Sequence, residues 1–236
     1  IHLCTYDYDL YPKVTISDLI EFILLKTNIR RIRLSSLEIN EIDNKIIDLL
    51  KDKRVCKHLH IPLQSGDDRI LKHMNRNYSN IDYFNVIMKI LKVIPDISLG
   101  TDVIVGFPGE GDNEFENTRI LLEELPIAYT HIFPFSARPG TKASEMMQDR
   151  PDPGIIKKRC SLLRELGSGK KATYFRKQIG ETLDAIIENI HDDMSFVGIT
   201  GNYLRVRASL ITQKQKDIVH IRISGVVNDE LIGDLL

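Results

Sequence analysis

Polar residues that could bind a ligand gather at four points where strand-like runs of the sequence end. The segment Gly100–Glu110 carries Asp102 and then turns through two glycines and a proline. Glycine lets the backbone approach a flat ligand closely, although this glycine spacing is also common in plain turns. The other three strand ends add hydroxyl, amide, aromatic and guanidinium groups, carried by Ser36, by Gln64, and by Phe135, Ser136 and Arg138. This set suits a polar ligand with a base and a sugar, and it includes no nucleophile beside a base.

A second pattern is the pair His58 and His60, which project to the same side of a strand-like run. Two imidazoles on one side could bind a metal. No carboxylate or third histidine lies beside them in the sequence, and histidines inside a barrel are often held by hydrogen bonds. We therefore expect no metal site and no catalytic side chain in this chain.

The elements that must position these residues are strand-like runs that alternate with helix-like runs. The expected helices include one capped by Thr15 with Asp18, a second capped by Asn40, and three at 67–74, 81–93 and 114–125. This alternation predicts α/β units around a largely parallel sheet, either a partial barrel or a doubly wound sheet, with ligand sites at the carboxyl ends of strands. The expected strands are Ile1–Thr5, Arg30–Ser35, His58–Leu63, Ile97–Gly106 and Ile127–Phe135.

The remainder of the chain changes character twice. Arg150–Lys177 reads as a helix with nine basic and two acidic side chains. Short strand-like runs at 182–187, 203–208 and 218–223 then predict a small all-β barrel of OB-like type. We expect a first domain at 1–148, a basic helical connector at 149–171 and a second domain at 172–236.

Composition excludes several classes of protein. The 236 residues are 42% hydrophobic and 28% charged with a net charge of −1, which argues against disorder and against a polycation. The three cysteines form no C-x-x-C pair, which argues against a disulfide scaffold or a zinc site. No apolar run reaches the roughly 18 residues that span a bilayer. These features favour a soluble, cytoplasmic protein without a membrane partner.

Five strings of the sequence resemble those of the radical S-adenosylmethionine methylthiotransferases: RIRLSSLE, HIPLQSGDDRILKHMNR, GTDVIVGFPGE, ELPIAYTHIFPFSARPGTKA and GITGNYLRV. The last two are most similar to the branch that modifies threonylcarbamoyladenosine next to the tRNA anticodon. The isopentenyladenosine and ribosomal-protein branches remain alternatives. The resemblance implies a partial (β/α) barrel that binds S-adenosylmethionine beside a [4Fe–4S] cluster, followed by a TRAM barrel that binds RNA. In the family, adenine C2 is methylthiolated by a radical mechanism.

The resemblance also implies functional residues. The candidates for contacts to S-adenosylmethionine are Ser36, Gln64, Asp102, Gly106, Phe135 and Ser136. Arg138 is expected nearer the tRNA anticodon stem-loop. Phosphate contacts are expected from basic residues and base stacking from Tyr203, unless Tyr203 is a core aromatic. The basic candidates are Lys170, Lys171, Arg176 and Arg205.

The sequence departs from the family in its cysteines. The family's C-x-x-x-C-x-x-C motif and its auxiliary-cluster cysteines are absent from these residues, so we expect this chain alone to bind no cluster and to be inactive. Asp7 and Gly111 replace a usual glycine and threonine. The electron donor is unknown. Two alternatives remain open: a non-catalytic nucleotide- or RNA-binding remnant, and an unrelated barrel enzyme that uses Asp102 and Glu110 as acid and base.

Overall fold

The chain folds into two compact units, Ile1–Ser168 and Gly169–Leu236. The computed structural model describes all residues except 1–10, 12–13, 35 and 210–211. The expected strand Ile1–Thr5 and the unusual Asp7 therefore lie outside the described residues. The expected boundary at 171–172 falls inside helix α7 (Pro153–Arg176), close to the division between the units.

The first unit is built on a parallel sheet in the order β1-β2-β3. The strands are β1 (His58–His60), β2 (Ser98–Val105) and β3 (Tyr129–Pro134). They fall within the third, fourth and fifth of the expected runs. The second expected run, Arg30–Ser35, is not a strand where it is described; this region contributes single parallel bridges from Ile32 to Val55 and from Ser36 to His60.

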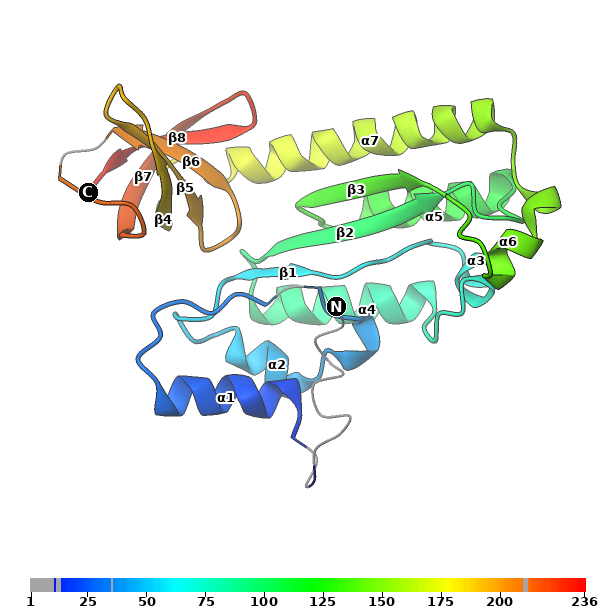
Figure 1. Cartoon of the computed structure of the whole chain (residues 1–236), viewed down its shortest axis with the longest axis horizontal. Helices are drawn as coiled ribbons and strands as arrows, with labels where there is room; N and C mark the ends of the chain where they lie inside the picture. Colours follow the sequence, from blue (N-terminus) through cyan, green and yellow to red (C-terminus); the bar gives the residue numbers. More distant parts are fainter. Residues whose placement is uncertain (1–10, 12–13, 35, 210–211) are drawn as a thin grey trace. The chain divides into compact units, whose positions relative to one another are not determined.

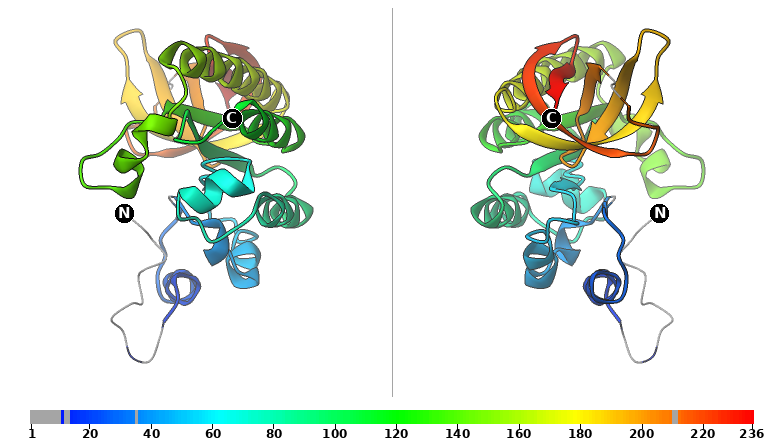
Figure 2. Two further views of the ribbon diagram at one scale, coloured as in Figure 1. Left: turned by 90° about the vertical axis from the view of Figure 1, so that its right-hand side faces the viewer. Right: turned by 90° about the vertical axis from the view of Figure 1, so that its left-hand side faces the viewer.

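Helices connect the strands and cover one side of the sheet. In Figure 1, α4 runs along β1, and the end-on view in Figure 2 places α2, α4 and α5 on an arc outside the strands. The expected α/β alternation is confirmed. The helices of this unit are α1 (Ile16–Lys26), α2 (Asn44–Leu49), α3 (Asp68–His73), α4 (Asn80–Val93), α5 (Asp112–Glu124), α6 (Lys142–Glu145) and the start of α7, with 3-10 turns η2 (Ile39–Glu41) and η3 (Met147–Asp149).

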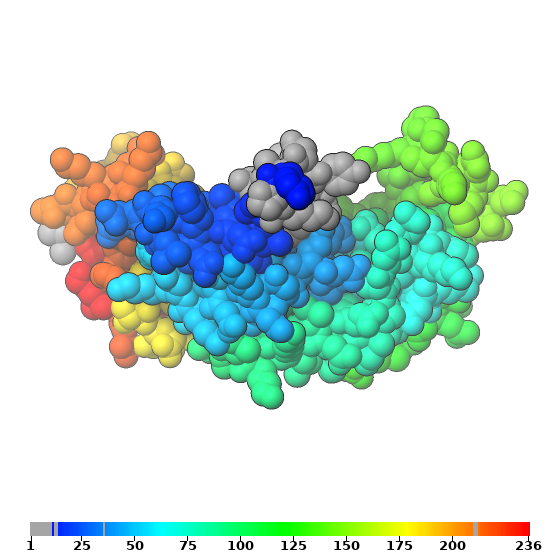
Figure 3. All heavy atoms as spheres, turned by 90° about the horizontal axis from the view of Figure 1, so that it is seen from below, coloured from blue at the N-terminus to red at the C-terminus, as the bar shows by residue number. Residues whose placement is uncertain are grey.

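Side-chain caps fix where the early helices begin. Thr15 and Asp18 form the expected capping box at α1. The prediction for the next helix was wrong, because Asp43 rather than Asn40 accepts a hydrogen bond from the Ile46 amide and caps α2. Helices α1 and α2 lie on one outer surface of the unit (Figure 3), where Lys45 bridges to Asp18 at 2.6 Å. A cap needs its acceptor directly before the first turn, which Asn40 is too early to supply.

Burial alternates along the strands, so the two faces of the sheet differ. Leu99, Val103 and Val105 of β2 are fully buried in the core that includes Tyr83 of α4. Asp102 and Ile104, at the alternate positions, are only partly buried. Successive side chains of a strand point to opposite faces. The helices therefore cover one face, and the other face carries the polar residues described below.

The second unit is a closed barrel with strand order β4-β5-β6-β8-β7. Its core contains Phe196, Ile221 and Leu231, and Phe175 of α7 packs with them. The predicted small all-β barrel is confirmed. The strands are β4 (Thr182–Ile190), β5 (Ser195–Thr200), β6 (Arg205–Ser209), β7 (Ile218–Val227) and β8 (Glu230–Leu235). Among the described residues of either unit, no helix is long and apolar enough to cross a membrane.

Candidate functional site

The sheet brings four residues from distant parts of the sequence into one row. Ser36 pairs with His60, His60 with Gly100, and Gly100 with Tyr129. A Cβ added at Gly100 would lie 2.0 Å from Cζ of Tyr129. Because Gly100 has no side chain, the Tyr129 ring can lie across β2. Its hydroxyl is 2.8 Å from Nε2 of His58 and 3.3 Å from Nδ1 of His60.

The neighbouring row adds a carboxylate and a third imidazole on the same face. Asp102 of β2 is in register with His131 of β3. Nε2 of His60 lies 3.1 Å from Oδ1 of Asp102, and the ring centroids of His60 and His131 are 5.8 Å apart. His60 and Asp102 are partly buried, whereas His131 is exposed. The row thus forms a polar cluster with one open side.

His58 occupies the buried end of this cluster. Burial, together with the smaller effects of the positive charge of Arg33 and of the neighbouring His60, lowers the pKa of His58 to about 3. The imidazole is therefore neutral at ordinary pH. The expectation that His58 and His60 face the same side is confirmed, since the Tyr129 hydroxyl contacts both rings. Tyr129 and His131 were missed in the sequence, although the period of two in 127–135 places both on one face.

Gln64 extends the sheet beyond β1 in a strained conformation. Its amide donates to the Asp102 carbonyl at 2.9 Å, and its carbonyl accepts from the Ile104 amide at 2.9 Å. Its backbone φ angle is +67°, a conformation that residues other than glycine rarely adopt. Strain of this kind persists when surrounding bonds hold it and is concentrated at functional sites. Gln64 thus lies next to Asp102 at the carboxyl end of the sheet.

The glycine turn after β2 is closed by internal contacts. The Gly106 amide donates to Oε1 of Glu110 at 3.0 Å, and a Cβ at Gly106, whose φ is +79°, would lie 2.5 Å from Ile156. Arg159 donates to Oε1 of Glu110 at 2.9 Å and to Asp112 at 2.7 Å. Gly106 therefore approaches a helix side chain closely. Its role as a ligand contact stays a prediction.

Glu110 is unsuited to the acid–base role considered from the sequence. Its side chain is 2% exposed and paired with Arg159. Burial raises the pKa of Glu110, against the opposing effects of the Gly106 amide and Arg159. A carboxyl locked in a buried ion pair cannot reach a substrate. The alternative of a barrel enzyme that uses Asp102 and Glu110 as acid and base is therefore left with Asp102 alone.

The end of β3 places its three candidates differently. Phe135 is buried and packs edge-on against Phe107 with ring centroids 5.0 Å apart. It belongs to a small apolar cluster with Ile70. Ser136 and Arg138 are exposed. The aromatic ring expected at the rim is thus part of the packing, while the hydroxyl and guanidinium remain accessible.

Comparison with known proteins identifies the family of this chain. The sequence model of the Radical SAM superfamily matches residues 4–122. The chain belongs to this superfamily. It is 37% identical over 235 residues to a threonylcarbamoyladenosine tRNA methylthiotransferase of Rickettsia prowazekii, a match that covers 99% of this chain and 52% of the relative.

Two further relatives carry related names. A threonylcarbamoyladenosine tRNA methylthiotransferase of Aquifex aeolicus is 40% identical, over 85% of this chain and 46% of its own length. A tRNA-2-methylthio-N(6)-dimethylallyladenosine synthase of Acetivibrio thermocellus is 33% identical, over 98% of this chain and 49% of its own length. This radical SAM chain spans about half the length of these curated relatives.

The described cysteines of this radical SAM chain do not provide a cluster site. Cys56 and Cys160 are both buried, and burial raises the pKa of each thiol. Cluster ligands are thiolates that converge on the iron. Cys56 lies just before β1 and Cys160 lies in α7, and neither belongs to a cluster of three or more potential metal ligands among the described residues. Cys4 lies outside the described residues.

The second unit places its RNA candidates on the surface. The Tyr203 side chain is 50% exposed with φ of +65°, so it is not a core aromatic of the barrel. Its neighbour Asn202 is buried and donates to Gln178 at 3.0 Å, which anchors the turn.

Two of the basic candidates in this unit form ion pairs. Lys171 pairs with Asp229 at 3.0 Å and Arg205 with Glu230 at 3.3 Å. Arg176 is exposed, and Lys170 is partly exposed. RNA contacts by all of these residues stay predictions. The Lys171 and Arg205 side chains of these ion pairs are at least partly exposed to solvent. Ion pairs of this kind are weak, so a phosphate group can replace the carboxylate partner.

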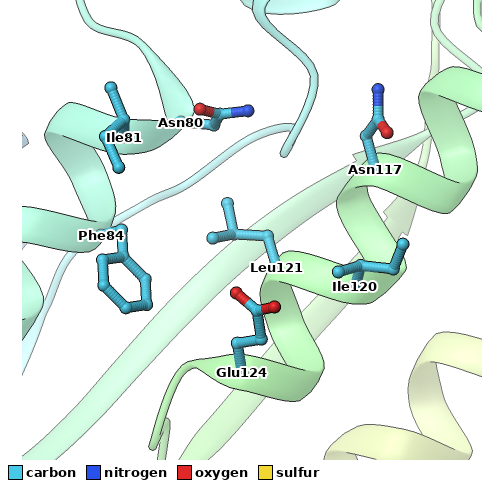
Figure 4. Close-up of a pocket in the computed structure, with 7 residues that line it drawn as sticks. All are labelled: Asn80, Ile81, Phe84, Asn117, Ile120, Leu121 and Glu124. Atoms are coloured by element: carbon cyan, nitrogen blue, oxygen red, sulfur yellow. The ribbon is translucent and has the colours of Figure 1, made fainter.

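A shallow groove lies on the covered side of the sheet, away from the polar rows. Figure 4 shows it between α4 and α5, with Asn80 and Asn117 toward one end and Glu124 toward the other. None of the candidate cofactor residues lines it. The lining residues are Asn80, Ile81, Phe84, Asn117, Ile120, Leu121 and Glu124.

Proposed function

We propose that this chain is the S-adenosylmethionine-binding and tRNA-binding part of a radical SAM methylthiotransferase that acts on threonylcarbamoyladenosine next to the anticodon. The observation that carries the proposal is the 37% identity to the Rickettsia prowazekii relative, which extends along 99% of this chain and therefore through both units. The match to the Acetivibrio thermocellus relative, a tRNA-2-methylthio-N(6)-dimethylallyladenosine synthase, keeps dimethylallyladenosine as the alternative substrate.

The proposed S-adenosylmethionine site lies at the polar face and carboxyl ends of the strands. Ser36 is exposed next to His60, Gln64 is held at φ of +67°, and Asp102 is partly buried between them and β3. A hydroxyl, an amide and a carboxylate together can accept and donate the hydrogen bonds that an amino acid and a ribose require. Ser136 and Gly106 complete the candidate set, and Phe135 supports it from the packed side.

The proposal assigns no step to an iron–sulfur cluster, because the described cysteines do not fit one. In this proposal the chain binds S-adenosylmethionine and positions the tRNA base. The second unit would contact the anticodon stem-loop through Tyr203 and the basic residues Lys170, Lys171, Arg176 and Arg205. Arg138, which follows the end of β3, would also contact the tRNA.

Titration of S-adenosylmethionine into the purified chain tests the cofactor site. We expect Gln64→Ala and Asp102→Asn each to weaken binding about tenfold, since each removes hydrogen bonds worth roughly 1–2 kcal/mol. The matched control is Asp48→Asn, an exposed aspartate on α2 that should leave affinity unchanged. Far-UV circular dichroism checks the fold of each variant. Equal affinity in the parent, Gln64→Ala and Asp102→Asn would reject the assignment.

A further inference from the structure

We propose that His60, Asp102 and His131 form a binding site for a first-row divalent cation such as Zn²⁺ or Co²⁺. The proposal does not depend on the proposed function, because it concerns a site made by three side chains of this chain alone. It also revises the expectation from sequence that this chain has no metal site, which followed from the lack of a carboxylate or third histidine beside the pair in the sequence. The pairing of the strands supplies both.

The geometry of the three groups supports this site. One ligand atom from each residue lies within 4.8 Å of the other two. Nε2 of His60 and Oδ1 of Asp102 are already 3.1 Å apart, close to the separation of two ligands around a metal with bonds of about 2.1 Å. Rotation of the His131 side chain can bring its ring nitrogen to the metal. That rotation is open to it, because His131 is the exposed member.

The strands hold the other two ligands in place. His60 and Asp102 lie on the neighbouring parallel strands β1 and β2, and Asp102 is in register with His131 on β3. A site built on three strands of one sheet has its ligand directions fixed by the backbone. The flexible part is therefore confined to the His131 ring.

A second layer of contacts orients His60. The Tyr129 hydroxyl lies 3.3 Å from Nδ1 of His60, which leaves Nε2 on the side of Asp102 and His131. Metal-binding histidines usually have their other ring nitrogen held by a hydrogen bond in this way. The hydroxyl also contacts Nε2 of His58 at 2.8 Å, so Tyr129 is itself fixed. Gly100 makes this arrangement possible by leaving room for the ring.

The donor set selects the class of metal. Two imidazole nitrogens and one carboxylate oxygen suit Zn²⁺, Co²⁺, Ni²⁺ or Fe²⁺, whereas Mg²⁺ and Ca²⁺ prefer oxygen ligands throughout. Three protein ligands with an exposed member leave at least one coordination position open. A site of this kind can bind a further small ligand at the metal.

Cobalt titration of the chelator-treated chain without an affinity tag tests the proposal. We expect one equivalent of Co²⁺ to give visible d–d absorption that Zn²⁺ displaces. His131→Gln and His60→Gln should each weaken Co²⁺ binding at least tenfold. The matched control is His73→Gln, because His73 is an exposed histidine on α3 outside the cluster and should leave the affinity unchanged. His131 is exposed, so its variant keeps the proposal testable even if His60→Gln fails to fold.

Two results would overturn the metal site. One is Co²⁺ affinity that is the same in the parent and in His131→Gln. The other is a thiolate-to-cobalt charge-transfer band, which would place the metal on a cysteine. Asp102 also belongs to the proposed S-adenosylmethionine site, so Gln64→Ala separates the two. This variant should weaken S-adenosylmethionine binding and leave the Co²⁺ titration unchanged.

Discussion

The ring of Tyr129 occupies the space that a side chain at Gly100 would fill. A Cβ at Gly100 would lie 2.0 Å from Cζ of the ring, and the hydroxyl beyond it contacts His58 and His60 on the next strand. One glycine thus lets a β3 side chain reach β1 across β2. The polar cluster depends on this crossing.

Gly100→Ala should therefore destabilise the first unit by about 1–3 kcal/mol, the usual cost of forcing an extra methyl into a packed site. In a Tyr129→Ala background the same substitution should be nearly neutral, because the obstructing ring is gone. Native-state hydrogen exchange of β1–β3 measures the cost of Gly100→Ala in each background, and it reports on the first unit alone. A cost that is equal in the two backgrounds would mean that the ring is not the obstacle.

The buried pair of Arg159 and Glu110 ties α7 to the turn after β2. Arg159→Met should cost about 3–5 kcal/mol, because Glu110 would keep a buried charge without its partner. Adding Glu110→Gln should recover much of this loss. Arg119→Met is the control, since Arg119 pairs with Glu116 on the exposed surface of α5, where such pairs contribute less than about 1 kcal/mol. Hydrogen exchange of α5 and β2 would report these changes, and equal effects of Arg159→Met and Arg119→Met would contradict the assignment.

Tyr78 should make the first unit sensitive to alkali. Its hydroxyl donates to the Leu63 carbonyl at 3.1 Å, and burial raises the pKa of Tyr78 to about 12 from its usual 10. The folded-state pKa is the higher one. The contribution of the protonated Tyr78 side chain to the free energy of unfolding is therefore fully present below pH 10. It is lost as pH rises from 10 toward 12, by up to about 1.4 kcal/mol per pH unit.

Stability measured between pH 9 and 11 checks this prediction. Tyr78→Phe should flatten the decline, whereas Tyr203→Phe, at an exposed tyrosine of the second unit, should not. Buried Tyr83, whose pKa is raised for the same reason, keeps part of the slope in both variants. A slope unchanged by Tyr78→Phe would count against the assignment.

The exposed Tyr203 predicts base stacking by the second unit. Tyr203→Ala should weaken binding of an anticodon stem-loop RNA by about 1–3 kcal/mol, the usual value of one stacked base. Met194→Ala is the control, because Met194 is similarly exposed on the same unit without offering an aromatic face. Fluorescence anisotropy at several salt concentrations measures the affinity. Phosphate contacts from Lys170, Lys171 and Arg176 require that binding weakens as salt rises, and a flat salt dependence would contradict them.

Local patterns of the sequence predicted most elements of both units. The capping box of Thr15 and Asp18 and the β-like run that became β2 are local, because caps and alternation depend on neighbouring residues. Strands β5 and β8 were missed because Gly198 and Gly233 interrupt their patterns. The barrel requires these glycines. An added Cβ would lie 2.6 Å from the Ile186 carbonyl oxygen at Gly198, and 2.3 Å from that of Arg222 at Gly233.

The sequence by itself determined the α/β order, the small barrel, the shared face of His58 and His60, and the resemblance to radical SAM methylthiotransferases. Only the tertiary structure decided which residues meet. Strand pairing placed Tyr129 against His58, 71 residues away, and brought Asp102 and His131 to His60. Packing of α7 against the turn after β2 enclosed Glu110 with Arg159, 49 residues away. The reason is physical: parallel strands are joined by long crossovers, so their register follows from packing across the whole sheet and leaves no local trace in the sequence.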